Sequence, residues 1–84
     1  MDNQERWTKI IGDIARERDR QDLQWGGAAH DDEHIPYDWQ GFIEKQCRRL
    51  CSGAIPANDY REHLVKIAAI AVAAIESYDR KAGK

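Results

Sequence analysis

The segment His30–His34 gathers the densest set of groups capable of chemistry. It reads His-Asp-Asp-Glu-His, so two imidazoles and three carboxylates fall within five residues. Such groups bind transition metals, and with Cys47 and Cys51 they can form a Cys₂His₂ zinc site. The spacing is not the closely paired pattern of a zinc knuckle, however, and Asp31 or Asp32 can instead accept backbone N–H bonds in an Asx turn. We therefore predict neither a bound metal nor a cofactor.

Aromatic side chains flank this polar segment. Trp25 precedes it, and Tyr37 and Trp39 follow it. Rings beside a polar loop can stack on a nucleotide base, although in a small domain they also fill the core. On the first interpretation, Trp25, His30, His34 and Trp39 are candidate ligand-binding residues.

Charge is distributed unevenly along the chain. The net charge is −2, which excludes a global basic field of the kind that attracts DNA or RNA, so no nucleic-acid partner is expected. Acidic residues crowd the first half and basic residues the second. This asymmetry allows a local basic pocket despite the acidic total.

A first helix is predicted from Asp2 or Asn3, either of which can cap it, to Gln24. Its apolar stripe consists of Trp7, Ile10, Ile11 and Ile14. The same face continues through Arg18 and Gln21, so the stripe turns polar halfway along. Those two side chains either project into water with the end of the helix or line a polar pocket beside the core.

Two further helices are expected. Residues 26–36 are predicted to be a loop, and Pro36 suits the first turn of a second helix over Tyr37–Cys51. The buried stripe of this helix is predicted to be Trp39, Phe42, Ile43, Cys47 and Leu50. A third helix is predicted over Asp59–Lys81, with Asp59 and Glu62 as a capping pair.

The third helix is apolar on all sides. From Leu64 to Ile75 only Lys66 interrupts the apolar residues, and many of them are alanines, which permit close helix contact. Such a helix must be covered all round, and an 84-residue chain buries only about 60–65% of its unfolded surface. We therefore predict one all-α domain, residues 1–84, forming a three-helix antiparallel bundle. It assembles into a homo-oligomer through the Ala-rich third helix.

The compartment is predicted from three features of the sequence. The N-terminus lacks the apolar core of a signal peptide, and the apolar run 67–75 is too short to span a membrane. Cys47 and Cys51 are the only cysteines, spaced four apart on a helix, where a disulfide is geometrically poor. The prediction is a cytoplasmic protein with no membrane partner.

Three segments together resemble a group of small uncharacterised proteins of bacteriophages and prophages. They are RERDRQDLQWG, HDDEH with the following Trp39, and YREHLVKIAAIAVAAIESYDRK. Some of that group are similar to the MazG-like all-α nucleotide pyrophosphohydrolases. The resemblance covers most of the chain, and its motifs are more specific for the phage group than for the enzymes. It implies a phage protein acting in the host cytoplasm.

In the MazG-like fold, Glu-Glu-x-x-Glu and Glu-x-x-Asp motifs on successive helices hold Mg²⁺ against a triphosphate. Here Glu44 matches the first motif, but Lys45 and Arg48 stand where its other carboxylates would be. The second motif falls on His63 and Lys66, and a register shifted by one residue keeps a single carboxylate. Cations repel a metal dication but bind phosphate directly. The resemblance thus implies nucleotide binding through Lys45, Arg48, His63 and Lys66 without hydrolysis, although Lys66 can also be a lysine that reaches from an apolar surface into water.

The resulting prediction is a non-catalytic, nucleotide-binding phage protein with pockets between its subunits. It would act as a sponge for a cyclic or modified nucleotide signal of host defence. One alternative is a Mg²⁺-dependent MazG-like pyrophosphohydrolase using Glu44, Glu62, Glu76, Asp79 and Asp31 or Asp32. Another is a protein inhibitor of a host defence complex, with an acidic face of Asp13, Glu17, Asp31, Asp32 and Glu33.

Overall fold

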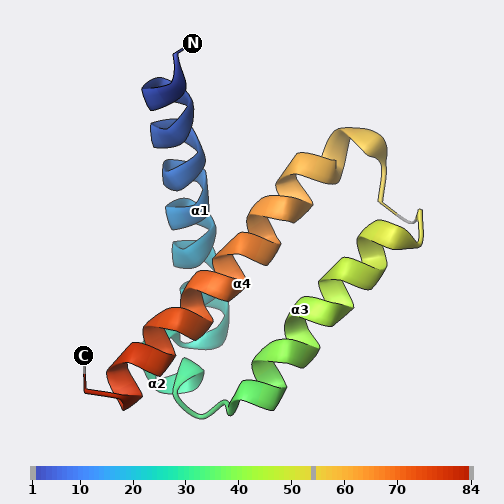
Figure 1. Cartoon of the computed structure of the whole chain (residues 1–84). Coiled ribbons are helices and arrows are strands. Elements are labelled where there is room, and N and C mark those ends of the chain that lie inside the picture. The colour runs from blue at the N-terminus through green and yellow to red at the C-terminus, as the bar shows by residue number, and fades with distance from the viewer. Residues whose placement is uncertain (1, 54, 84) are drawn as a thin grey trace.

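The computed structural model describes residues 2–53 and 55–83, and these fold entirely into helices and connecting turns. The elements are α1 (Asn3–Trp25), α2 (Gly27–Asp31), α3 (Pro36–Cys51), a 3₁₀ turn η1 (Ala57–Asp59) and α4 (Tyr60–Lys81) (Figure 1). The predicted all-α class is confirmed, since these residues contain no strand. No helix in the described ranges combines the length and apolarity needed to cross a membrane.

The three long helices match their predicted boundaries to within one residue, but the prediction of a loop over residues 26–36 is wrong in part. Gly26 ends α1 in the left-handed conformation, with φ 106°, and donates its N–H to the carbonyl of Asp22 at 2.9 Å. The chain then turns back into helix at once, as α2. Ala28 and Ala29 favour helix strongly, so the Gly-Gly pair separates two helices and does not open a long loop.

The helix ends follow the capping predictions at two places and depart from them at a third. Asp2 caps α1 by accepting the N–H of Glu5 at 2.7 Å, and Pro36 occupies the first position of α3. The predicted Asp59–Glu62 capping pair is wrong, because Asp59 makes no side-chain cap. Since η1 already winds the chain into α4, Asp59 has helical backbone angles and not the extended ones of a capping residue.

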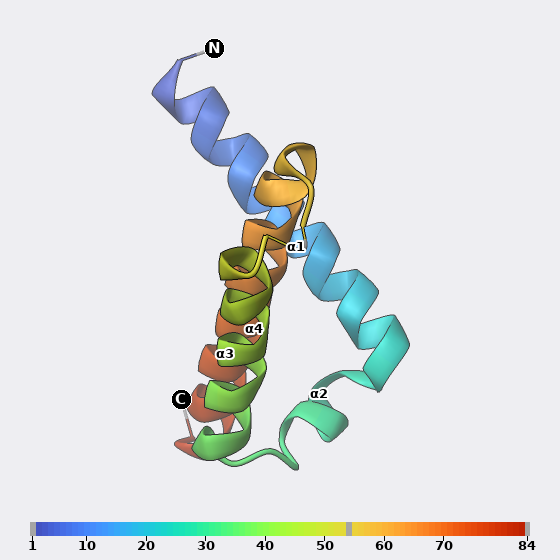
Figure 2. The ribbon, with the colours of Figure 1, turned by 90° about the vertical axis from the view of Figure 1, so that its right-hand side faces the viewer.

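Helix α4 is the central element. It packs against α3 along one side and is crossed by α1 on another, and α2 contacts both α1 and α4 (Figures 1 and 2). Helices α3 and α4 run antiparallel in one layer. Within the described residues, α1 and α3 do not contact each other. Both pack against α4, and the space between α1 and α3 is open.

The buried interior is small and partly polar. Ala69 and Ala73 are its buried apolar residues among those described, and His63, Asp31 and Ser77 are buried beside them. Only half of the predicted apolar stripe of α1 is covered: Ile10 and Ile14 are half-buried, whereas Trp7 is 64% exposed and Ile11 is exposed as well. Because α1 crosses α4 near its own midpoint, its apolar first half extends away from the other helices while its polar second half packs.

Candidate ligand-binding site

A hollow among the described residues lies in the angle between α1 and α3, with α2 at one end and α4 as its floor. Its volume is about 640 Å³, within the range of small-molecule sites. It is lined by eight of the ten predicted ligand-binding residues: Arg18, Gln21, Trp25, His30, His34, Trp39, Lys45 and Lys66. One chain builds this hollow by itself, in contrast to the prediction of pockets between subunits.

A continuous series of rings forms one wall. The ring of Trp25 lies almost parallel to that of His30, at a centroid distance of 6.2 Å, and His30 meets His34 edge-on at 4.8 Å. His34 in turn contacts Trp39 at 5.4 Å and Phe42 at 5.0 Å, both edge to face. Edge-to-face packing fixes ring orientations, so the wall is an ordered aromatic surface suited to a planar group. Tyr37, the third ring near this segment in the sequence, is exposed and does not line the hollow.

Three cations face the hollow without a partner. Lys45 and Arg49 come from α3 and Lys66 from α4. The side chains of the three form no hydrogen bond and no ion pair with any residue of the described ranges, although Lys66 lies near enough to Glu17 to help lower the pKa of that carboxyl. An unpaired ammonium or guanidinium group beside an apolar wall is a ready binding site for an anion, above all for phosphate.

Arg18 lines the same hollow, but its donors are already committed. Its guanidinium bonds Glu76 and Asp22, each at 3.1 Å, and lies 3.6 Å from Oδ2 of Asp31. Burial alone would lower the pKa of Arg18, but the hydrogen bonds from its side chain to Glu76 and Asp22 outweigh it and raise the pKa above its usual value. The residue therefore stays charged and joins α1, α2 and α4, which is a structural role.

The acidic residues at the end of α2 and just after it, Asp31 and Asp32, lie against the C-terminal part of α4. Asp32 accepts hydrogen bonds from the Oγ–H of Ser77 at 2.8 Å and from a guanidinium N–H of Arg80 at 2.8 Å. The bonds from Arg80 lower the pKa of the Asp32 carboxyl. Lys81 donates to the carbonyl of His34 at 2.6 Å. Asp31 is only 8% exposed, and its Oδ2 accepts no hydrogen bond. The segment thus positions His30 and His34 in the wall through side-chain contacts to α4, not through the Asx turn that the sequence allowed.

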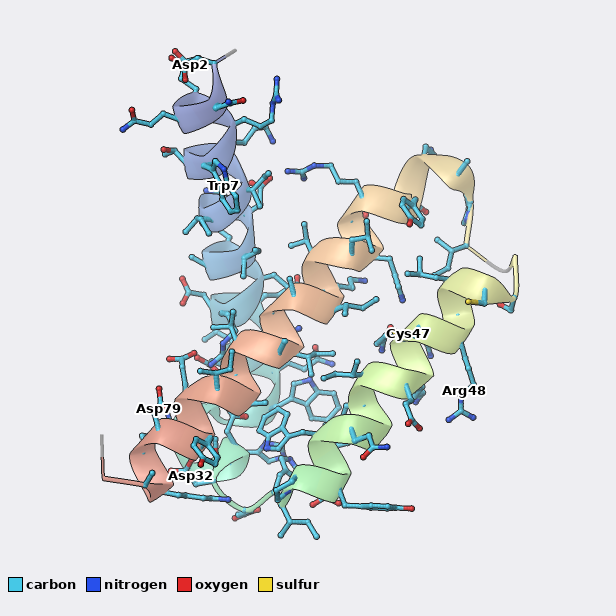
Figure 3. All side chains as sticks on the ribbon, viewed as in Figure 1. Asp2, Trp7, Asp32, Cys47, Arg48 and Asp79 are labelled. Atoms are coloured by element: carbon cyan, nitrogen blue, oxygen red, sulfur yellow. The ribbon has the colours of Figure 1, made fainter. Side chains whose placement is uncertain are left out.

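Two predicted site residues lie outside the hollow. Arg48 points outward from α3, with 78% of its side chain exposed, and its guanidinium lies 3.7 Å from Glu44 (Figure 3). Successive helical residues are rotated by about 100°, which turns Arg48 about 120° away from the hollow-facing Phe42. His63 is buried between α4 and α3, where its Nε2 lies 3.2 Å from the carbonyl of Gln46.

Sequence reasoning missed Arg49 and Phe42 as residues of the site. Both lie on the face of α3 that includes Lys45, since Arg49 follows Lys45 by four residues and Phe42 precedes it by three. Helical periodicity alone would have identified Arg49. The register of the enzyme motif pointed to Arg48 instead.

The cysteines and the His-Asp-Asp-Glu-His segment do not form a common site. Cys47 and Cys51 are both exposed free thiols, and the prediction that Cys47 belongs to the buried stripe of α3 is wrong. Gln46 and Leu50 are half-buried on α3, whereas Cys47 is exposed. Among residues 2–53 and 55–83, no three His, Cys, Asp or Glu side chains are grouped closely enough to hold a metal ion.

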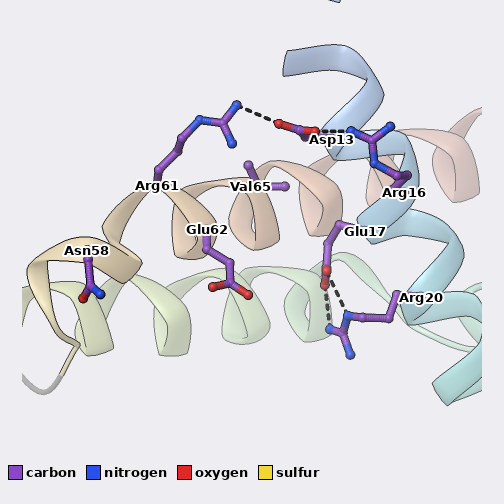
Figure 4. A pocket seen from close by; sticks show the side chains of 8 residues that line it. All are labelled: Asp13, Arg16, Glu17, Arg20, Asn58, Arg61, Glu62 and Val65. Carbon is purple, nitrogen blue, oxygen red and sulfur yellow. Dashed lines mark hydrogen bonds and ion pairs between the residues drawn. The ribbon is translucent and has the colours of Figure 1, made fainter. Parts of the chain in front are cut away.

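A second, smaller cleft of about 480 Å³ lies between α1 and the start of α4 (Figure 4). Its three arginines are all paired with carboxylates. Arg61 bonds Asp13 at 2.8 Å, Arg16 bonds the other oxygen of Asp13, and Arg20 bonds Glu17 at 2.6 Å. The hydrogen bonds from Arg61 and Lys9 lower the pKa of Asp13 to about 2, and that from Arg20 lowers the pKa of Glu17.

Comparison with models of protein families, with curated proteins and with solved structures finds no match.

Proposed function

We propose that this chain binds a nucleotide in the hollow between α1, α2, α3 and α4 and does not hydrolyse it. The observation that supports the proposal is that Lys45, Arg49 and Lys66 line one hollow beside an ordered wall of rings, with side chains that form no ion pair among the described residues. A nucleotide carries both features that such a site would recognise, a planar base and phosphate oxygens. Stacking on aromatic side chains contributes about 1–3 kcal/mol per base, and charge-assisted bonds hold the phosphates.

The arrangement of carboxylates favours binding over metal-assisted hydrolysis. A Mg²⁺ site needs several oxygens that converge on one point. Several of the predicted catalytic carboxylates face arginines instead: Glu44 lies beside Arg48, and Asp32 bonds Arg80. Glu76 and Asp31 both face Arg18, at 3.1 and 3.6 Å, so a cationic side chain already lies between these two carboxylates. We therefore prefer a binding protein to an Mg²⁺-dependent pyrophosphohydrolase.

The inhibitor alternative depends on a free acidic face, and four of its five residues have cationic partners. Asp13 bonds Arg61, Glu17 bonds Arg20, Asp32 bonds Arg80, and Asp31 lies 3.6 Å from Arg18. A protein that mimics nucleic acid needs exposed, uncompensated negative charge. The pairing favours the nucleotide-binding proposal.

In the setting that the resemblance to phage and prophage proteins implies, the proposed role is sequestration. The protein would take a cyclic or modified nucleotide signal of host defence out of solution and leave it intact. Such a role requires affinity and abundance, with no chemistry on the ligand.

Isothermal titration calorimetry with nucleoside triphosphates, cyclic dinucleotides and cyclic ADP-ribose variants tests this proposal. We expect at least one of them to bind with a micromolar or lower dissociation constant. Arg49→Ala should weaken that binding about tenfold, because it removes one charge-assisted contact. Arg48→Ala is the matched control, since the adjacent arginine points away from the hollow, and it should leave the affinity unchanged. Binding by none of the panel, or equal effects of the two substitutions, would overturn the proposal, and Mg²⁺-dependent release of pyrophosphate would favour the enzyme.

We further propose that the chain works as a homo-oligomer through α4. Its accessible surface is 6194 Å², whereas a folded monomer of 84 residues exposes about 5,100 Å². The radius of gyration is 14.0 Å, against about 12 Å for a compact domain of this length. The surplus of about 1,100 Å² exceeds the roughly 800 Å² that each partner buries in a standard interface. Association with further copies would remove this surplus from water.

A further inference from the structure

The side of α4 opposite the hollow carries a regular apolar stripe. We call it the outer stripe, and it consists of Leu64, Ala68, Ala71, Ile75 and Tyr78. At about 100° per residue, Ala71 lies on the far side of the helix from the buried Ala69 and Ala73. Ile75 is 60% exposed, and Leu64 and Tyr78 are exposed as well. Ala68 and Ala71 are half-buried, so the described chain leaves the large side chains of the outer stripe, Leu64, Ile75 and Tyr78, uncovered.

The spacing of the outer stripe is that of a helix that pairs with another helix. Its members follow one another at intervals of four, three, four and three residues. An average interval of 3.5 keeps an apolar stripe in contact with a partner helix along its whole length. The two alanines at the centre allow close approach, while the larger side chains lie toward the ends.

We propose that α4 pairs antiparallel with the α4 of a second copy across a two-fold axis close to Ala71. The inference rests on the self-association proposed above. It adds which surface of α4 forms the interface and how the two α4 helices are aligned. Ala71 then meets the same residue of the second copy, and Ala68 packs against the partner's Ile75. Leu64 packs against the partner's Tyr78. The stripe is thus complementary to itself, as an interface with two-fold symmetry requires.

The charges beside the outer stripe support the antiparallel direction. Arg61 and Asp79 lie on the same flank of α4, since they are 18 residues apart, which is about five full helical turns. Asp79 has no ion-pair partner in residues 2–53 and 55–83, and it lies on the side of α4 away from α3 (Figure 3). Antiparallel pairing about Ala71 brings each Arg61 beside the partner's Asp79. Arg61 bonds Asp13 at 2.8 Å within its own copy, and it would contact the partner's Asp79 in addition to, or in place of, that carboxylate. Opposite charges at both ends then favour this register over a parallel one.

The pairing leaves the ligand site open. Lys66, Ile70 and Ala73 face the hollow from the other side of α4. A dimer formed through the outer stripe therefore presents two independent hollows to solvent. Ligand affinity and dimer formation can be measured separately.

Light scattering on the full chain tests the interface, with Ile75→Glu and Ile35→Glu as a matched pair. The two isoleucines are 60% and 58% exposed, but Ile35 precedes α3 and lies outside the outer stripe. We expect a dimer or a larger even assembly for the wild type and for Ile35→Glu. For Ile75→Glu we expect a dimer dissociation constant raised at least about 100-fold, because a carboxylate would be buried in the interface.

A monomeric wild type would overturn both the self-association and this inference. An assembly that survives Ile75→Glu would overturn only the pairing through the outer stripe. Neither result bears on nucleotide binding, which calorimetry tests by itself.

Disulfide cross-linking tests the register and does not depend on how well Ile75→Glu folds. In a Cys47→Ser/Cys51→Ser background, Ala71→Cys should link two copies under mild oxidation. Ala68→Cys alone should not, because antiparallel pairing separates the two Ala68 positions by about 9 Å along the axis, too far for a disulfide. Ala68→Cys combined with Ile75→Cys should link. Linking by Ala68→Cys alone would indicate a parallel pair, and no linking at Ala71→Cys would overturn the proposed axis.

Discussion

The two cavities of this molecule differ in how their cations are partnered. In the cleft between α1 and the start of α4, Arg16, Arg20 and Arg61 each bond a carboxylate. The hollow shares the Glu17–Arg20 pair with the cleft, and its Arg18 is paired as well. Its other three cations differ, because the side chains of Lys45, Arg49 and Lys66 form no hydrogen bond or ion pair with the described residues. Both cavities are rich in charge, so the number of charged residues does not distinguish them. The pairing of the charges does distinguish them. Ion pairs in the cleft connect α1 to α4 or neutralise each other, whereas unpaired cations in the hollow attract an anion.

Neutralising two cations in each cavity tests this difference most strongly. Lys45→Gln/Lys66→Gln removes two unpaired charges from the hollow and should weaken binding of the calorimetric ligand about 100-fold or more. Arg16→Gln/Arg61→Gln removes the same formal charge from the cleft and should change the affinity less than about twofold, since screening weakens surface charges at a distance. Comparable losses from both pairs would mean that overall charge, and not the hollow, attracts the ligand.

Replacing a tryptophan inside and outside the hollow gives a smaller expected effect. Trp39→Ala removes a ring that contacts His34 and Phe42 in the wall, and should weaken binding about tenfold through lost stacking. Trp7→Ala is the control, because Trp7 lies on the extended half of α1. Trp39→Phe keeps an aromatic ring and should recover most of the affinity in calorimetry. If all three variants bind like the wild type, the ring wall takes no part in binding.

The sequence predicted some parts of this molecule and not others. Local signals predicted the long helices well, because caps, proline and apolar periodicity act within a few residues. Most of the hollow was also predictable, since Trp25, His30, His34 and Trp39 flank one short segment. Neither the short α2 nor the burial of Asp31 under Arg18 and α4 follows from local patterns.

The failures at Arg48 and in α1 have physical causes that lie beyond a single helix. Arg48 and Arg49 are chemically identical neighbours, and only the rotation of α3 against α4 decides which one faces the hollow. The apolar half of α1 has the pattern of a core face, yet α4 meets α1 at its midpoint. Which half of a helix packs is decided by the crossing point, and that depends on contacts far apart in the sequence.

The smallest expected effect concerns the cleft, where the paired charge of Asp13 contributes to the stability of the fold. The pKa of Asp13 is lowered to about 2 from 3.8, first by its bond to Arg61 and then by its bond to Lys9. A carboxylate with a depressed folded-state pKa contributes stability above its unfolded pKa and loses it as the pH falls through the folded value. The Asp13 contribution should therefore be complete at neutral pH and disappear between about pH 4 and pH 2.

Thermal unfolding of the wild type and of Asp13→Asn across this range measures that contribution. The substitution should lower the Tm by a few degrees at neutral pH, because Asp13 lies in an exposed cleft where water and salt weaken ion pairs. The two Tm curves should converge as the pH falls toward 2. Ligand affinity at pH 7 should be unchanged, since Asp13 is not part of the hollow. A weakened affinity without a change in Tm would show that the cleft takes part in binding and that the two cavities are not separate in function.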